Sequence, residues 1–415
     1  MSSPEKPITN WGGNHAYRAA GIERPATLGA LQRLVASSAH LSALGTRHSF
    51  TAIGDGEVLV DLALLASPPV VDHDRGVVDV GGSTTYADLA VTLQAAGRAL
   101  HNMASLPHIS VGGAIATGTH GSGSALGNLS TAVETIEMIT ASGELVVFHR
   151  GDAGFDGAVV HLGALGLVTR VALRTEAAYE VAQTVYDGLD WATLTGSFDE
   201  VFGAATSVSC FTRWGDRAGE LWCKQRVDRE PDRTLTDRLR PAAESRHPIP
   251  GAGVDACTTQ GGVIGPWWDR LPHFRADAEP SSGAEIQSEF FVDRSDSGAA
   301  IEALRRIGPT LDPLLLVGEI RTVAADQFWL SPCCARDSTA FHFTWRRNND
   351  AAAAAVERIG DALAPFTPRP HWGKIMPAGW RAVESYDRLD DFVQLRHRLD
   401  PGGRFLTPWV EERIG

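Results

Sequence analysis

The chain has 415 residues, of which 43% are hydrophobic and 21% charged, a composition typical of globular proteins that bury a sizeable core. Its 37 basic and 50 acidic residues give a formal net charge of −13, which argues against a nucleic-acid partner and against attraction to an anionic membrane. The five cysteines have neither zinc-ligand nor disulfide spacing, so we expect reduced thiols and no metal site.

The first 177 residues predict a domain of helices and hairpins. Met1 is followed by polar residues rather than by the apolar stretch of a signal peptide, so we expect a cytoplasmic protein without a membrane partner. Helical spacing, period-two alternation and turn residues predict a helix over 27–39 capped by Thr27, a strand over 58–62, a hairpin over 70–80, a helix over 86–96 that ends at Gly97, and a hairpin over 133–148.

A glycine turn at residues 44–50 reads Leu-Gly-Thr-Arg-His-Ser-Phe. Gly45 allows backbone N–H groups to point into one concavity, which is a common way to hold an anion. His48 stands within this turn beside Arg47. Taken alone, a histidine in such a turn usually just bonds to nearby backbone, so the segment indicates a cofactor site only in combination with other features.

A long loop is expected over residues 101–127, with five glycines between Gly112 and Gly123. Loops of this length inside a compact domain are usually functional or disordered, and here the apolar flanks and the lack of charge runs favour function. The segment 117–123 resembles a phosphate cradle, but it lacks the Gly-Lys-Ser/Thr ending of a P-loop and does not open a helix after a strand. An ordinary dinucleotide fold is therefore disfavoured. The two glycine-rich loops could instead hold one elongated anion, for which a pyrophosphate-containing flavin is a candidate.

The second half of the chain predicts a different domain. Glycine becomes less frequent after residue 178, and a polar, proline-rich connector spans 228–250. Alternating patterns and helical spacing then predict strands over 285–292, 314–323 and 339–345, a helix over 351–363, and a helix over 386–399 near the end.

Polar residues of the three predicted strands would share one face if the strands were neighbours. These residues are Glu285, Gln287, Glu289, Glu319, Arg321, His342 and Thr344, and Lys374 follows in the next segment. The solvated face of an antiparallel sheet produces the same pattern. The mixture of hydrogen-bond donors and acceptors favours instead a site for a neutral polyhydroxy compound, because carboxylates accept from hydroxyl groups while arginine and lysine donate to them.

Several motifs along almost the whole chain are specific when taken together. They are Gly-Thr-Arg-His-Ser-Phe at 45–50, Asn-Met-Ala-Ser-Leu-Pro-His through Gly-Thr-His-Gly-Ser-Gly at 102–123, Gly-Ala-Leu-Gly at 163–166, Glu-Ile-Arg-Thr at 319–322, His-Phe-Thr-Trp at 342–345 and Arg-Pro-His-Trp-Gly-Lys at 369–374. In this combination the chain resembles the vanillyl-alcohol-oxidase superfamily of flavoproteins, and most of all its bacterial alditol (xylitol) oxidases.

The resemblance implies an α+β fold with three parts. A two-subdomain FAD-binding domain of the PCMH type would span residues 1–177. A substrate-binding cap domain, with a large antiparallel sheet flanked by helices, would span 178–364. The C-terminal segment 365–415 would return to the FAD-binding domain.

The resemblance also implies roles for individual residues. His48 matches the histidine bonded covalently to the flavin, and the other FAD contacts match Ala43, Leu44, Gly45, Thr46, Arg47, Ser49, Ser105, Ser110, Gly113, Ala116, Thr117, Gly118, Thr119, Val168 and His371. The residues that hold the alditol match Ser105, Glu319, Arg321, Thr344 and Lys374, and the catalytic group would comprise Arg321, Lys374 and His342. The family commonly has Gly-Ser-Gly before the histidine, so Thr46 and Arg47 are a departure. Arg47 either bonds a pyrophosphate oxygen or points outward.

By this resemblance the chain is expected to be an FAD-dependent oxidase that converts the terminal primary alcohol of alditols, such as xylitol and sorbitol, to the aldose. A hydride would pass to flavin N5, a neutral Lys374 or His342 would take the hydroxyl proton, and oxygen would become hydrogen peroxide. Two alternatives are an aldonolactone oxidase or dehydrogenase of the same superfamily and a non-catalytic flavin- or sugar-binding protein. We expect a monomer whose partners are a small polyol and oxygen.

Overall fold

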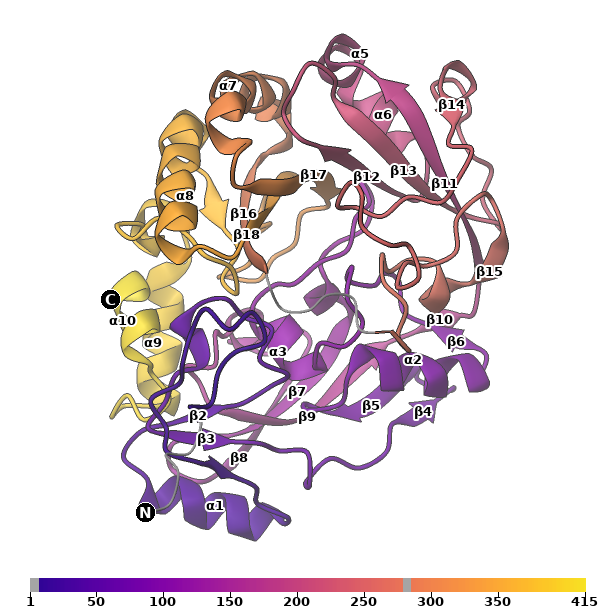
Figure 1. Cartoon of the computed structure of the whole chain (residues 1–415). Coiled ribbons are helices and arrows are strands. Elements are labelled where there is room, and N and C mark those ends of the chain that lie inside the picture. The colour runs from indigo at the N-terminus through magenta and orange to yellow at the C-terminus, as the bar shows by residue number, and fades with distance from the viewer. Residues whose placement is uncertain (1–6, 279–284) are drawn as a thin grey trace, which may run out of the picture.

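Two β-sheets, one in each half of the chain, dominate the computed structural model, which describes residues 7–278 and 285–415 (Figure 1). The expectation for the first residues of the chain falls largely on residues 1–6 and lies outside the described residues. None of the helices within the described ranges has the length and apolar character of a membrane span.

The first domain consists of two small subdomains. One is a parallel sheet of order β1-β3-β2 beside helix α1, with bounds β1 Ile22–Glu23, α1 Leu28–Ser37, β2 Leu41–Ala43 and β3 Val58–Val60. The other is an antiparallel sheet of order β4-β5-β9-β7-β8, with bounds β4 Val70–Asp72, β5 Val77–Gly81, β7 Val133–Ile139, β8 Leu145–His149 and β9 Leu167–Arg174. Helices α2 (Tyr86–Ala95), α3 (Val111–Ala116) and α4 (Phe155–Val159) contribute to its core.

Local sequence signals explain the helices of this domain. Thr27 caps α1 by accepting a hydrogen bond from the N–H of Ala30 at 3.2 Å, and Leu31 and Val35 are its buried residues. Thr85 caps α2 in the same way. Gly97 follows α2 with a φ of 66°, a left-handed conformation in which glycine commonly ends helices.

The cap domain is built on a nine-stranded sheet. Its strand order is β14-β11-β13-β12-β17-β18-β16-β19, with β15 paired to β11, and its neighbouring strands are antiparallel. The bounds are β11 Glu180–Leu189, β12 Ser207–Thr212, β13 Gly219–Arg226, β14 Arg240–Pro241, β15 Ile264–Pro266, β16 Glu285–Asp293, β17 Leu315–Val323, β18 Ser338–Arg346 and β19 Arg369–Pro370.

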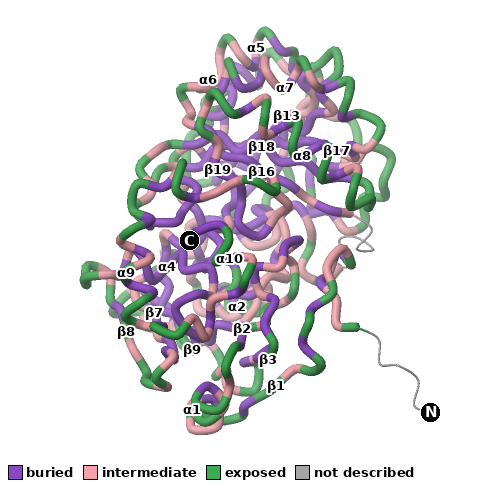
Figure 2. Tube along the Cα trace, turned by 90° about the vertical axis from the view of Figure 1, so that its left-hand side faces the viewer, coloured by how far each residue is buried: buried purple, intermediate pink, exposed green. Residues whose placement is uncertain are grey.

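Helices cover the apolar face of this sheet and leave its polar face toward the first domain (Figure 1). They are α5 Trp191–Gly196, α6 Phe198–Gly203, α7 Ser297–Leu311 and α8 Asn349–Leu363. Their apolar side chains form one core with Ile320, Phe341, Phe343 and Trp345. Figure 2 shows the central strands of the cap as buried.

The end of the chain packs against the first domain. Helices α9 (Leu389–Leu399) and α10 (Pro408–Ile414) contribute side chains to the same core as β5, β7 and β9. Strands β6 (Arg98–Ala99) and β10 (Glu176–Ala177) form an antiparallel pair just before the chain enters the cap domain. Short 3₁₀ helices occur at Ala52–Gly54, Leu129–Ala132, Thr236–Arg238, Trp267–Asp269, Arg294–Asp296, Ala364–Phe366 and Ala382–Glu384.

The predicted fold class, α+β with a cap built on a large antiparallel sheet, is confirmed. The predicted strands of the cap are also confirmed, and β17, β18 and β16 are neighbours. The expectation of an uninterrupted loop over residues 101–127 is wrong, because α3 lies within it. Strands β11, β12 and β13 and helices α5, α6 and α7 were not predicted.

Candidate active site

A cavity of about 740 Å³ lies between the first domain and the polar face of the cap sheet. Its lining comes from the turn at 44–50, from the loops around residues 104–119 and 161–168, from the cap strands, and from residues 371–374. A cavity of this volume is large enough for a cofactor together with a small substrate.

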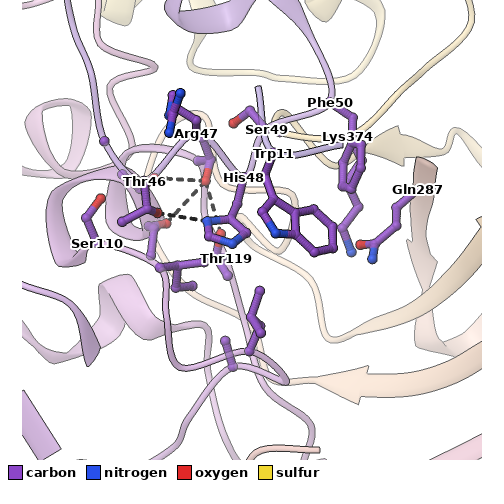
Figure 3. A pocket seen from close by; sticks show the side chains of 18 of the residues that line it. Trp11, Thr46, Arg47, His48, Ser49, Phe50, Ser110, Thr119, Gln287 and Lys374 are labelled. Atoms are coloured by element: carbon purple, nitrogen blue, oxygen red, sulfur yellow. Dashed lines mark hydrogen bonds between the residues drawn. The ribbon is translucent and has the colours of Figure 1, made fainter. Parts of the chain in front are cut away.

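Contacts on both sides hold the turn that carries His48 (Figure 3). Nδ1 of His48 lies 2.9 Å from Oγ1 of Thr46, and its ring stacks on Trp11 with 5.3 Å between the ring centroids. Arg47 has a φ of 63°, and its guanidinium donates to the carbonyl of Thr9 at 3.2 Å. The Arg47 side chain therefore points outward, and the left-handed backbone explains why the resembled family has glycine at this position.

His48 is uncharged at neutral pH. Burial, followed by the effects of His108 and Arg47, lowers the pKa of His48 to about 4. A neutral imidazole keeps a nitrogen lone pair, which is what a bond from the ring to a carbon atom requires.

Glycines allow the two cofactor loops to approach each other. A Cβ on Gly45 would lie 2.7 Å from Oγ of Ser110, and a Cβ on Gly113 would lie 2.9 Å from the same oxygen. A Cβ on Gly112 would lie 2.8 Å from the carbonyl oxygen of Gly82. Larger residues would push the loops apart, so bare main chain lines this end of the cavity. This lining fits FAD, because its pyrophosphate needs close backbone donors.

Glu289, on β16, is the centre of the polar wall at the cap end of the cavity. It is fully buried, and its Oε1 lies 2.5 Å from Nη2 of Arg321 while its Oε2 lies 2.7 Å from Nζ of Lys374. Nε2 of His120 lies 3.4 Å from Oε1. Burial alone would raise the pKa of Glu289, but Lys374 and Arg321 hold it well below its usual range. An ionised carboxylate therefore holds both cations in place.

Lys374 forms a short chain of hydrogen bonds with two residues of β18. Its Nζ lies 2.8 Å from Nδ1 of His342, and Nε2 of His342 lies 3.0 Å from Oγ1 of Thr344. Burial, followed by the charge of Lys374, lowers the pKa of His342 to about 3, so its ring is neutral. Burial also lowers the pKa of Lys374, although Glu289 opposes the shift. The ammonium of Lys374 is thus easier to deprotonate than that of an exposed lysine.

Glu319 and Arg321, on β17, extend the wall toward the first domain. Oε2 of Glu319 lies 3.5 Å from Nε of Arg321, and Oε1 lies 2.9 Å from Nε2 of His273. Burial would raise the pKa of Glu319, but Arg321 and His273 keep it below its usual range. Arg321 also reaches Oγ of Ser105 in the first domain, at 3.3 Å. The strand face therefore presents ionised and hydroxyl groups side by side.

The segment after β19 positions Lys374 by pairing with β16. The N–H of His371 donates to the carbonyl of Glu289 at 3.0 Å, and that of Ile375 donates to the carbonyl of Gln287 at 2.9 Å. Between these two bonds, the N–H of Lys374 donates to the carbonyl of His371 at 3.0 Å. The resulting turn directs the lysine toward the Glu289 carboxylate.

The structure brings nearly all of the predicted site residues together. Those matched to FAD contacts line the cavity except Gly118, whose added Cβ would meet Pro332 at 2.9 Å instead. Those matched to the alditol, and His342, line it as well. The alternative of a solvated sheet face is wrong for the central residues, because Glu289, Glu319 and Arg321 are at most 4% exposed.

Three residues of the site, and Lys224 behind it, were given no role by the sequence. Glu289 was recognised as part of the polar face, but its position between two cations depends on strand order. His120, His273 and Lys224 come from segments whose strand or loop neighbours the sequence did not reveal. A lysine directly after the apolar residues Leu221, Trp222 and Cys223 of β13 was the available signal. Within the described residues, no three histidine, cysteine or acidic side chains are grouped as metal ligands.

Comparisons with known proteins place this geometry in a wider context. A family described as "FAD binding domain" matches residues 19–149, and one described as "D-arabinono-1,4-lactone oxidase" matches residues 285–413. An alditol oxidase of Streptomyces sp. (strain IKD472 / FERM P-14339) is 44% identical over 98% of this chain and 99% of its own length. An L-gulono-1,4-lactone dehydrogenase of Mycobacterium tuberculosis is 28% identical over 98% of this chain and 99% of its own.

The fold also occurs among solved structures. The crystal structure of cholesterol oxidase from B. sterolicum superposes with a TM-score of 0.77, at 14% sequence identity, over 100% of this chain and 99% of that one. This similarity supports the overall fold, in which the first domain lies beside a large antiparallel sheet.

Proposed function

This chain belongs to the alditol oxidase family of vanillyl-alcohol-oxidase flavoproteins, and on that premise we propose that it oxidises the terminal primary alcohol of an open-chain alditol, such as xylitol or sorbitol, to the aldose. The observation that carries the proposal is the buried polar wall formed by Glu319, Arg321, Glu289 and Lys374. It combines acceptors and donors for several hydroxyl groups at one end of a cavity whose other end fits FAD.

FAD would supply the oxidant: a hydride from the alcohol carbon would be accepted at flavin N5, and oxygen would take up the two electrons with two protons and leave as hydrogen peroxide. The glycine-rich loops would hold it, and His48 would attach it covalently. The neutral imidazole of His48 and its place on the cavity wall support this attachment.

The polar wall would bind and orient the alditol. Glu319 would accept hydrogen bonds from substrate hydroxyls, and Ser105 and Thr344 would fix others, so that a flexible neutral chain takes up one reactive orientation. Arg321 would lie near the reacting oxygen and favour its alkoxide character, since its guanidinium is held by two carboxylates and cannot move away.

Lys374 would take the hydroxyl proton. In its neutral form the amine has two N–H groups. One can donate to Oε2 of Glu289 at 2.7 Å and the other to Nδ1 of His342 at 2.8 Å. One lone pair then remains for the proton of the substrate hydroxyl. Burial, which lowers the pKa of Lys374, makes this neutral form accessible.

The closest alternative is an aldonolactone oxidase or dehydrogenase, because lactone-acting relatives share the fold and the end of the chain. A steady-state comparison of xylitol, sorbitol and L-gulono-1,4-lactone, with hydrogen peroxide as the readout, separates the two. We expect the alditols to have the higher kcat/KM. A preference for the lactone would refute the proposal, and absence of peroxide with every polyol would favour a non-catalytic binding protein.

A further inference from the structure

Behind Glu319 lies a buried lysine that the proposed mechanism does not use. Lys224, on β13, is 1% exposed and is not part of the cavity lining. Its Nζ lies 2.5 Å from the carbonyl oxygen of Leu271, 2.9 Å from that of Pro272, and 3.1 Å from Nδ1 of His273. An ammonium has three N–H donors and no acceptor, so these three partners satisfy it completely.

His273 lies between Lys224 and the cavity, in a fixed orientation. Its ring makes edge contacts with Phe211 and Trp222, at centroid distances of 5.2 and 5.6 Å. Its backbone N–H donates to the carbonyl of Ser105 at 3.0 Å. The ring is therefore held by the cap on two sides, and its main chain is tied to the first domain.

The two ring nitrogens of His273 have different neighbours, which determines where its proton resides. Burial, followed by the charge of Lys224, lowers the pKa of His273 to about 4, so the ring is neutral and has one N–H. Burial lowers the pKa of Lys224 to about 7, although Glu319 opposes the shift, so below that pH Nδ1 faces an ammonium, which can only donate, and must therefore accept. The proton is left on Nε2, which lies 2.9 Å from Oε1 of Glu319 and donates to it.

We propose that Lys224 is a positioning residue: it keeps His273 in the Nε2–H form, and His273 in turn holds the Glu319 carboxylate against the cavity. Without the ammonium, His273 is free to take the Nδ1–H form. Its Nε2 lone pair then faces the carboxylate, and Glu319 loses both its donor and its orientation. This inference rests on the proposed function in one respect, namely that Glu319 binds the hydroxyl groups of the alditol.

Lys224 touches neither the substrate nor the cofactor site, so its effect should appear in binding more than in turnover. We expect Lys224→Met to raise the KM for xylitol by about tenfold or more, with a smaller change in kcat. His273→Leu should do the same, whereas His273→Gln, which keeps an N–H donor near the position of Nε2, should lose less. Equal losses in the two His273 variants would overturn the role of this donor.

A double-mutant cycle tests the route through Glu319. In a Glu319→Gln background, which has already lost the carboxylate, Lys224→Met should change KM by less than about twofold. If the two substitutions multiply their separate effects, Lys224 acts on the site in some other way and the proposal fails. Flavin absorbance and the thermal midpoint of each variant establish that it is folded.

A measurement on the wild-type protein keeps the proposal testable if Lys224→Met does not fold. Spectra of protein labelled with ¹⁵N in the histidine rings, assigned with His273→Gln, should show His273 as a neutral ring protonated at Nε2 when recorded between the pKa of His273, about 4, and that of Lys224, about 7. A ring protonated at Nδ1, or at both nitrogens, would overturn the proposal. This result does not depend on any alditol being a substrate, so failure of the proposed function and failure of this inference are distinguishable.

Discussion

Phe50 donates its backbone N–H to the carbonyl oxygen of Gly373 at 2.7 Å. The hydroxyl of Thr51 adds a second bond, to the carbonyl of Trp372 at 3.3 Å. These bonds join the turn that carries His48 to the turn that carries Lys374, although the two turns belong to opposite ends of the chain. The main-chain segments that carry the proposed flavin anchor and the proposed base are thus bonded directly to each other. This fixes the position of the two side chains relative to one another, as a catalytic site requires.

His48→Ala is expected to abolish covalent attachment of the flavin, because alanine has no ring nitrogen that could form the bond. Acid precipitation of the purified protein is the measurement: yellow colour should stay with the wild-type pellet and move to the supernatant, or be absent, in the variant. His161→Asn is a matched control, since His161 also lines the cavity and burial also lowers its pKa to about 4. Colour in the wild-type supernatant would contradict the assignment of His48.

Arg47→Gly is expected to stabilise the protein by up to about 1 kcal/mol, because a residue with a side chain is disfavoured by about that amount at a φ of 63°. The hydrogen bond that is lost, to the carbonyl of Thr9, is at the surface and contributes little. Thermal unfolding of the flavin-loaded protein is the measurement. Arg47→Ala serves as the control, since it removes the guanidinium but keeps the strained backbone. An equal rise in both variants would show that the charge, and not the backbone, is responsible.

The sequence predicted those strands and helices that have one apolar face and one polar face. Strands β16, β17 and β18 alternate because their aromatic face packs against helices while the other face meets the cavity. Strand β12 reads Ser-Val-Ser-Cys-Phe-Thr, and its short alternation breaks at Phe211, an apolar residue that packs on the face opposite Val208 and Cys210. Helix α3 reads Val-Gly-Gly-Ala-Ile-Ala, and two adjacent glycines disfavour a helix unless tertiary packing imposes it.

In the candidate site, too, the sequence predicted what lies within one strand but not what comes from other segments. Spacing within one strand was sufficient to group Glu319 with Arg321. The partners of these residues come from other segments: Glu289 from β16, and His273 from an irregular stretch that strand patterns do not reach. The central ion pairs therefore depend on strand order, and strand order is a tertiary property.

Glu289→Gln is expected to destabilise the protein by about 3 kcal/mol or more, because it leaves the buried charges of Arg321 and Lys374 without their shared carboxylate. The midpoint of chemical denaturation measures the effect. Glu302→Gln is the matched control: it removes the same charge from a partly exposed surface pair with Arg305 at 2.7 Å, and such pairs contribute less than about 1 kcal/mol. Similar midpoints for the two variants would mean that the Glu289 cluster is not held by its charges.

The pH dependence of kcat/KM is expected to identify the proton acceptor. If neutral Lys374 takes the hydroxyl proton, activity rises with pH until the amine is deprotonated, along a limb that burial moves below the ordinary lysine value. If His342 were the acceptor, it would already be neutral above its pKa of about 3, and the profile would have no rising limb between about pH 5 and 9.

Glu289→Gln sharpens this test, because Glu289 raises the pKa of Lys374 and its removal should move the rising limb to lower pH. The groups that also face the ammonium are His342, Arg321 and Glu319, and all three remain in the variant. Lys224 cannot be mistaken for the base, since loss of its proton should weaken the hold on Glu319 and make kcat/KM fall, not rise, with pH. A rising limb that stays in place in Glu289→Gln would therefore assign the titration to a group other than Lys374.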